Sequence, residues 1–212
     1  MSEQEDWRDE FVATLDHIDD AFDRVLRNSG PMGVLTPPDV HKLSEGLFLS
    51  AWTHWEEFLR WLMTLDLAHL RWSFLTWEVK DFRFKYSRRR LAQAILGHPD
   101  EKKWVEWSNI GDVLTRADAL FNSPHRFNAL RASTNDLDIM RRVRNAVAHK
   151  SDHAWLSFLK LARAAPFSLA GRQMKFITTG RFLSTATWGP AGGPVLKEGV
   201  ARLRTLAQGL VP

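Results

Sequence analysis

Cysteine and long apolar runs are both missing from this sequence. With no cysteine among its 212 residues, the chain has no disulfides, no thiolate metal sites and no thiol nucleophiles. No run of about 18 apolar residues occurs, so a membrane-spanning helix is not expected. The amino terminus is acidic and has no apolar segment of the kind found in signal peptides. These absences predict a cytoplasmic protein without a membrane partner.

The charge of the chain is distributed unevenly. The net charge is +4, yet residues 1–28 hold nine acids and three arginines and carry −6, which leaves +10 for the rest. Bases are concentrated in residues 80–90, where six face one acid, and in residues 141–150, where four face none. The first of these stretches also holds Phe82, Phe84 and Tyr86. Basic and aromatic residues together are compatible with an RNA backbone and stacked bases, and a solvated face or a core strand explains them as well.

Apolar residues at helical spacing predict an all-α protein, a helical bundle with irregular insertions and a C-terminal extension. Two long helices are expected over residues 7–28 and 39–66, the second capped by Asp39. Shorter helices are expected over residues 87–96, 111–121, 133–149, 154–164 and 195–209. The inward face of the second helix should hold Val40, Leu43, Leu47, Phe48, Ala51, Trp52, Trp55, Leu59 and Leu62.

The carboxyl-terminal part should differ from the rest. Residues 1–165 are expected to form the helical domain, and residues 166–212 an extended loop and a final helix that pack on it. The stretch from Thr178 to Trp188 is β-branched and aromatic and precedes a Gly/Pro-rich segment, a pattern that predicts extended chain.

The most informative residues are Arg144, Asn145 and His149, near the end of the helix expected over 133–149. At about 100° per residue, Arg144 lies to one side of the apolar face and His149 to the other. A curled arginine side chain, or a second copy of the helix, would bring the two groups together. A permanent cation and a group that exchanges protons near neutral pH are what RNA cleavage without a metal requires. The ordinary alternative gives each residue a structural role. Arg144 would cover apolar surface, and Asp138 and Arg142 would form a surface ion pair. His149 would bond the last carbonyl groups of the helix and complement its dipole.

Glu56 is an acid on the apolar side of the second long helix, between Trp52 and Leu59. A carboxylate within an apolar stripe is costly unless it is paired or hydrogen-bonded. Arg144 is its natural partner if this helix packs against the one that carries the motif. A position at the edge of the stripe, in reach of water, is the alternative.

Together these segments resemble the HEPN superfamily, all-helical proteins that include many prokaryotic ribonucleases. Its signature, Arg-x4–6-His with a polar residue after the arginine, is read here as Arg144-Asn145-Ala146-Val147-Ala148-His149. Residues 11–19 and 49–59 look like the first two helices of the RiboL-PSP-HEPN branch, and Glu56 matches the acid common in an early core helix of the superfamily. The resemblance covers roughly residues 7–165.

The resemblance implies a metal-independent endoribonuclease without a cofactor, acting as a homodimer whose two motif helices form one composite site. It implies that Arg144, His149, Asn145 and Glu56 form the catalytic set, and that such proteins act as toxins or anti-phage effectors with an antitoxin or defence-complex partner. In toxins silenced by AMP transfer a tyrosine follows the histidine by two positions, where this chain has Ser151. Basic side chains expected to bind RNA are Arg88, Arg89, Arg90, Arg141, Arg142 and Lys150.

Two other functions fit the same residues. A HEPN module without catalytic activity would bind RNA or a partner protein through its basic stretches. A structural or regulatory helical protein would instead dock its acidic first helix on a basic partner surface. RNA cleavage that depends on His149 would distinguish the ribonuclease from both of these alternatives.

Overall fold

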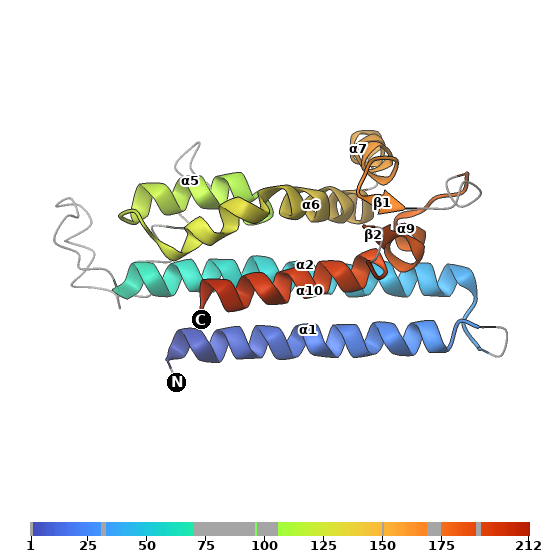
Figure 1. Ribbon diagram of the computed structural model, residues 1–212, viewed down its shortest axis with the longest axis horizontal. Helices are drawn as coiled ribbons and strands as arrows, with labels where there is room; N and C mark the ends of the chain where they lie inside the picture. Colours follow the sequence, from blue (N-terminus) through green and yellow to red (C-terminus); the bar gives the residue numbers. More distant parts are fainter. Residues whose placement is uncertain are drawn as a thin grey trace.

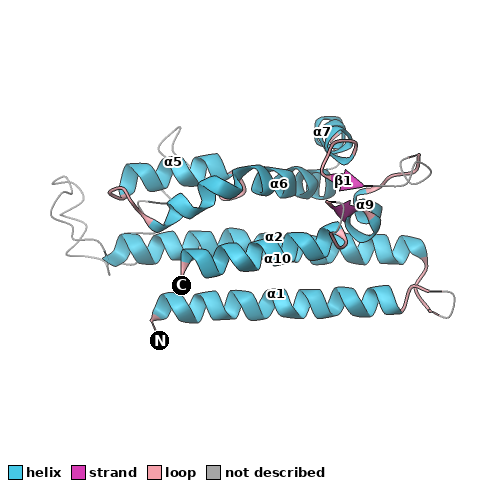
Figure 2. Ribbon diagram, in the orientation of Figure 1, coloured by secondary structure: helices cyan, strands magenta, loops and turns pink. Residues whose placement is uncertain are grey.

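The computed structural model describes residues 2–30, 33–69, 96, 106–149, 151–168, 175–189 and 192–212. In this part of the chain, α-helices dominate and strands are almost absent, which confirms the all-α prediction (Figure 2). Residues 87–95 of the helix expected over 87–96 and the basic residues Arg88, Arg89, Arg90 and Lys150 lie outside the described residues. None of the described helices has both the length and the apolar character needed to cross a bilayer.

Two long antiparallel helices, α1 (Glu3–Arg27) and α2 (Pro37–His69), form the base of the structure (Figure 1). Helix α1 begins with a capping box in which Ser2 and Glu5 bond each other's backbone N–H groups. Aromatic side chains join the pair, because Phe11 stacks on Phe58 with their ring centroids 5.0 Å apart. Trp55 of α2 also contacts Phe11, with ring centroids 6.0 Å apart, and is fully buried.

The start of α2 differs in two details from the sequence prediction. Asp39 lies in the first turn instead of capping it, and its carboxylate accepts hydrogen bonds from the N–H (2.9 Å) and the hydroxyl (2.5 Å) of Thr36. Leu43, expected in the core, is 44% exposed. At this end α2 contacts α9 (Thr179–Thr185) through Glu45 and the backbone of His41, neither of which belongs to the expected apolar stripe.

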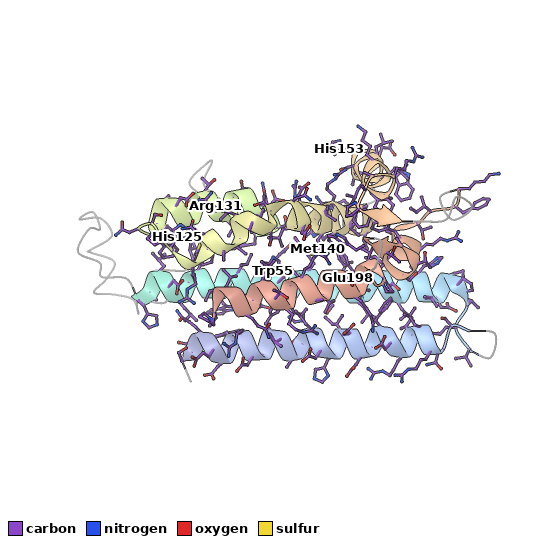
Figure 3. The ribbon with its side chains drawn as sticks, viewed as in Figure 1. Trp55, His125, Arg131, Met140, His153 and Glu198 are labelled. Carbon is purple, nitrogen blue, oxygen red and sulfur yellow. The ribbon has the colours of Figure 1, made fainter. Side chains whose placement is uncertain are left out.

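A second layer lies over α2 and consists of α5 (Ile110–Leu120), the 3₁₀ helix η2 (Arg126–Ser133) and α6 (Thr134–His149) (Figure 1). Helices α5 and α6 confirm two predicted helices. Helix α6 packs against α2 and against α10 (Val195–Leu210), where Gly199 leaves room for Met140. A Cβ atom on Gly199 would lie 3.4 Å from the Met140 sulfur. Met140 lies between α6 and these lower helices in Figure 3.

The extended loop predicted from Thr178 to Trp188 is wrong for most of its length. Residues Thr179–Thr185 form helix α9, and only Thr187–Trp188 (β2) are extended, paired antiparallel with Phe167–Ser168 (β1). A tertiary contact stabilises the helix, because Glu45 of α2 accepts hydrogen bonds from the Thr179 hydroxyl (2.5 Å) and the Gly180 N–H (3.0 Å). These bonds satisfy donors that a short helix leaves unpaired at its start.

Helix α10 covers α1 and neutralises part of its acidity. Arg204 pairs with Asp16 at 2.6 Å, and Lys197 pairs with Asp23 at 2.6 Å and faces Asp19 at 3.9 Å. At the other end of the helix, Arg8 donates to the carbonyl of Val211 at 3.0 Å. The acidic first helix is therefore an internal docking surface for the last helix along much of its length.

Candidate functional site

Helix α6 positions the motif because its apolar residues fix which side of the helix is buried. Leu137, Ile139, Met140, Val143 and Ala146 are buried, whereas Val147, expected in the core, is partly exposed. The helix ends at His149, which is exposed. The chain then turns into α7 (Asp152–Ala162), where Ser151 accepts a hydrogen bond from the Ala154 N–H at 3.2 Å. The motif thus occupies the last turns of a helix anchored on one face and open on the other.

The structure brings Arg144 and His149 together within one chain. The Nη1 atom of Arg144 lies 2.9 Å from Nε2 of His149 and donates to Oδ1 of Asn145 at 3.1 Å. The arginine side chain therefore curls back around the helix. This is the first of the two arrangements predicted from the sequence, the other being a second copy of the helix. A guanidinium only donates hydrogen bonds, so Nε2 of His149 must offer a lone pair in this arrangement. The imidazole is then neutral, the form that can accept a proton.

Glu56 faces the same arginine from α2. Its Oε1 atom lies 3.9 Å from Nε of Arg144, and the two side chains are 23% and 26% exposed. This contact confirms Arg144 as the partner of Glu56. Oε1 itself is buried and makes no hydrogen bond within the described part of the chain. Glu56 is half-buried: its Oε1 atom faces the interior and Arg144, and the side chain keeps the partial access to water that the edge position implies.

The surroundings of Glu56 oppose its ionisation. Burial raises the pKa of the Glu56 carboxyl above its ordinary value, and the negative charge of Glu106 raises this pKa further. The Arg144 guanidinium and the Trp52 indole N–H act in the opposite direction and lower it, without cancelling the effect of burial. Perturbed carboxyl groups of this kind are enriched at functional sites, although structural ion pairs produce them too.

The cations predicted to bind RNA have partners of their own where the structure describes them. Arg141 pairs with Asp138 at 2.7 Å, so the Asp138–Arg142 pair of the ordinary alternative does not form. Arg142 instead donates to the hydroxyl (3.0 Å) and the carbonyl (2.6 Å) of Ser157 on α7. These contacts give Arg142 a structural function at the α6–α7 junction, and its part in binding RNA stays a prediction.

Sequence reasoning missed two groups that act on Glu56, the indole of Trp52 and the carboxylate of Glu106. Trp52 precedes Glu56 by four residues on one helix, a spacing that places side chains next to each other and was visible in the sequence. Glu106 precedes α5 and reaches Glu56 only through the tertiary fold. No local pattern indicates that approach.

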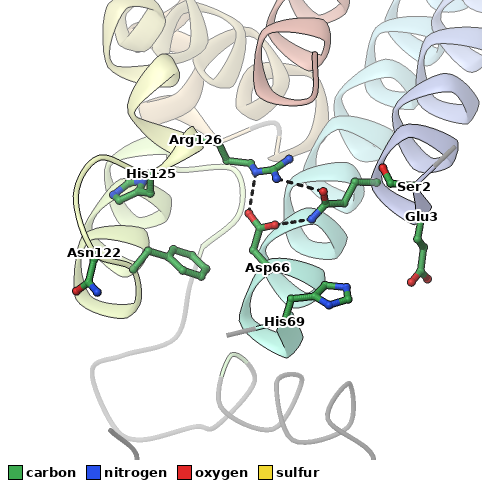
Figure 4. Close-up of a pocket in the computed structure, with 9 residues that line it drawn as sticks. Ser2, Glu3, Asp66, His69, Asn122, His125 and Arg126 are labelled. Carbon is green, nitrogen blue, oxygen red and sulfur yellow. Dashed lines mark hydrogen bonds and ion pairs between the residues drawn. The ribbon is translucent and has the colours of Figure 1, made fainter. Parts of the chain in front are cut away.

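A separate cavity of about 650 Å³ lies where the start of α1, the end of α2 and the segment between α5 and η2 meet (Figure 4). Its polar groups bond one another: Asp66 pairs with Arg126 at 3.0 Å and accepts from Gln4 at 2.6 Å, and Arg126 donates to Gln4 at 3.1 Å. None of its lining residues belongs to the motif. Within the described ranges, no group of three or more histidines and acids is arranged to hold a metal ion.

Comparisons of the chain with protein-family models, with curated proteins and with solved structures found no match. The function must therefore be inferred from the chemistry of the site itself, because an all-α fold alone is compatible with many activities.

Proposed function

We propose that this protein is a HEPN-type endoribonuclease that cleaves RNA without a metal ion and leaves a 2′,3′-cyclic phosphate and a 5′-hydroxyl. The observation that carries the proposal is the 2.9 Å contact between Nη1 of Arg144 and Nε2 of His149 on an exposed helix end. A guanidinium that can bind a phosphate and an imidazole that can accept a proton stand side by side there. These are the two groups that transesterification of an RNA phosphate needs.

The chemistry assigns a role to each side chain. Arg144 turns from His149 to the scissile phosphate and stabilises the charge that grows on its non-bridging oxygens. The freed Nε2 of His149 takes the proton of the ribose 2′-hydroxyl, whose oxygen attacks phosphorus while the bond to the 5′-oxygen breaks. The leaving 5′-oxygen takes a proton from a second imidazole or from water. Asn145 and Glu56 hold Arg144 in place.

A homodimer is part of the proposal, because one imidazole cannot be base and acid in the same step. A second copy whose α6 faces the first would supply the acid. The proposed setting is that of a toxin or anti-phage effector, controlled by an antitoxin or a defence-complex partner. A module without catalytic activity that binds RNA or such a partner is the alternative, and it predicts RNA binding without cleavage.

The deciding experiment incubates purified protein with single-stranded RNA in excess EDTA and analyses the product ends. The expected result is cleavage to a 2′,3′-cyclic phosphate and a 5′-hydroxyl, lost in His149→Ala and in Arg144→Ala. Arg131→Ala is the matched control, since Arg131 pairs with Asp118 at 2.7 Å away from the motif. RNA that stays intact, or cleavage that survives both motif substitutions, would disprove the proposal.

A further inference from the structure

Two buried polar atoms one helical turn apart on α2, the indole Nε1 of Trp52 and the Oε1 of Glu56, make no hydrogen bond to any residue that the structure describes. Trp52 is only 2% exposed, so water does not satisfy its N–H group. An indole N–H is solely a donor and a carboxylate oxygen solely an acceptor. Buried groups of this complementary kind are normally paired, and each is costly when it is not. Their spacing of four residues puts both side chains on one face of α2, where a rotation of the Glu56 side chain can bring the two groups together.

The distance to Arg144 shows that the Glu56 carboxylate has no hydrogen bond from this arginine and is free to accept one from Trp52. Arg144 uses Nη1 for His149 and Asn145, and its Nε stands 3.9 Å from Glu56, beyond hydrogen-bond distance. Glu56 thus has a cation on one side, at the range of an ion pair, and an indole N–H on the other.

We infer that Trp52 is a positioning residue whose indole N–H binds the Glu56 carboxylate when Arg144 moves from Glu56 to an RNA phosphate. This inference rests on the proposed function, since that function requires the movement of Arg144. The indole suits the task because it is a neutral donor. A second cation at this place would compete with Arg144 for the Glu56 carboxylate and would also hold a permanent positive charge beside the core.

The groups facing Glu56 show what would happen without the indole. Arg144 faces it from α6, Glu106 faces it from the segment before α5, and Trp52 faces it from its own helix. When Arg144 leaves, the half-buried carboxylate keeps a like charge beside it and loses its cation. Glu56 would then pull Arg144 back or take up a proton. The Trp52 N–H removes part of this cost, as its lowering effect on the pKa of Glu56 indicates.

The test compares Trp52→Phe with Trp55→Phe by RNA cleavage. Both positions are buried tryptophans of α2, with 2% and 1% exposure, so both substitutions remove an indole from the core. We expect kcat/KM for RNA to fall about tenfold in Trp52→Phe and about twofold or less in Trp55→Phe. In a Glu56→Met background, which has no carboxylate to hold, Trp52→Phe should have no further effect. Equal losses in the two tryptophan variants, or a loss that persists in the Glu56→Met background, would overturn the inference.

A second test is an NMR titration of the unsubstituted protein, which depends neither on catalytic activity nor on the folding of a variant. The ¹H–¹⁵N resonance of the Trp52 indole and the carboxyl ¹³C resonance of Glu56 are followed against pH. We expect both to move with one titration, because the N–H senses the charge of the carboxylate it faces. An indole resonance that ignores the Glu56 titration sinks the inference. A protein that shows the shared titration and cleaves no RNA leaves the Trp52–Glu56 pairing standing and refutes the proposed function instead.

Discussion

Arg144 and His149 share a contact that allows only one arrangement of protons. Since Nη1 of Arg144 must donate across the 2.9 Å to Nε2, the single proton of the neutral imidazole is on Nδ1. Long-range ¹H–¹⁵N correlation spectra of the neutral ring should therefore show the Nδ1–H tautomer of His149. In Arg144→Leu the preference should be lost. An Nε2–H tautomer in the unsubstituted protein would show that the contact does not exist in solution.

His149, at the end of α6, and His153, in the first turn of α7, provide a matched pair of exposed histidines. His153 is labelled in Figure 3. His149→Ala should lower the rate of RNA cleavage by about 10²- to 10⁴-fold, the usual contribution of a general acid or base. His153→Ala should change it little. The rates are measured with a fluorescent oligoribonucleotide in EDTA, with circular dichroism as the check on folding. Equal rates for His149→Ala and His153→Ala would remove His149 from the mechanism.

Glu56→Gln should change how stability depends on pH. Because the pKa of Glu56 is raised in the folded protein, folding favours its protonated form. This contribution is fully present below the pKa of the unfolded chain and is lost as pH rises through the folded pKa. Glutamine cannot lose a proton, so the free energy of unfolding of Glu56→Gln relative to the unsubstituted protein should increase with pH across that window.

Urea unfolding between pH 4 and pH 8 measures this difference. The pKa of Asp66 is raised as well, mainly by burial, but Asp66 is present in both proteins and cancels in the comparison. A difference that decreases with rising pH would mean that the ion pair with Arg144 outweighs the cost of burying the carboxylate.

Most of the helices, and the motif residues that lie together on α6, could be predicted from the sequence for the same reason. Apolar residues at spacings of three and four specify which face of a helix is buried, and the motif in α6 follows from that face. The same periodicity placed Glu56 on the inner side of α2, and pairing with Arg144 followed from the cost of a lone buried charge.

The parts that could not be predicted depend on contacts between segments distant in sequence. Residues 178–188 are β-branched and look extended, yet most of them form α9, whose start is stabilised by Glu45, more than a hundred positions earlier, through bonds from the Thr179 hydroxyl and the Gly180 N–H. The hydrogen bond between Arg142 and Ser157 and the interaction of Glu106 with Glu56 also join segments that are distant in sequence.

Gly180 tests how closely α9 is seated on α2. A Cβ atom at this position would lie 2.2 Å from the carbonyl oxygen of His41, which no side-chain adjustment can relieve. Gly180→Ala should lower the free energy of unfolding by about 1–3 kcal/mol or more. Gly46 in α2 is the control, since nothing lies within 4 Å of its Cβ position, and Gly46→Ala should stabilise the helix by about 0.5–1 kcal/mol. Thermal unfolding measures both, and a Gly180→Ala protein as stable as its parent would contradict the close packing of α9.

Gly199 brings α10 into close contact with the helix that carries Arg144 and His149. A methyl group added there would lie 3.4 Å from the Met140 sulfur and 4.0 Å from a ring carbon of Phe48, which is ordinary van der Waals contact. Alanine therefore fits at this position, whereas a larger side chain would reach past that contact and push α6 away from α10. The last helix thus limits the size of the side chain that the middle of α6 can pack against, although it lies about fifty residues later in the chain.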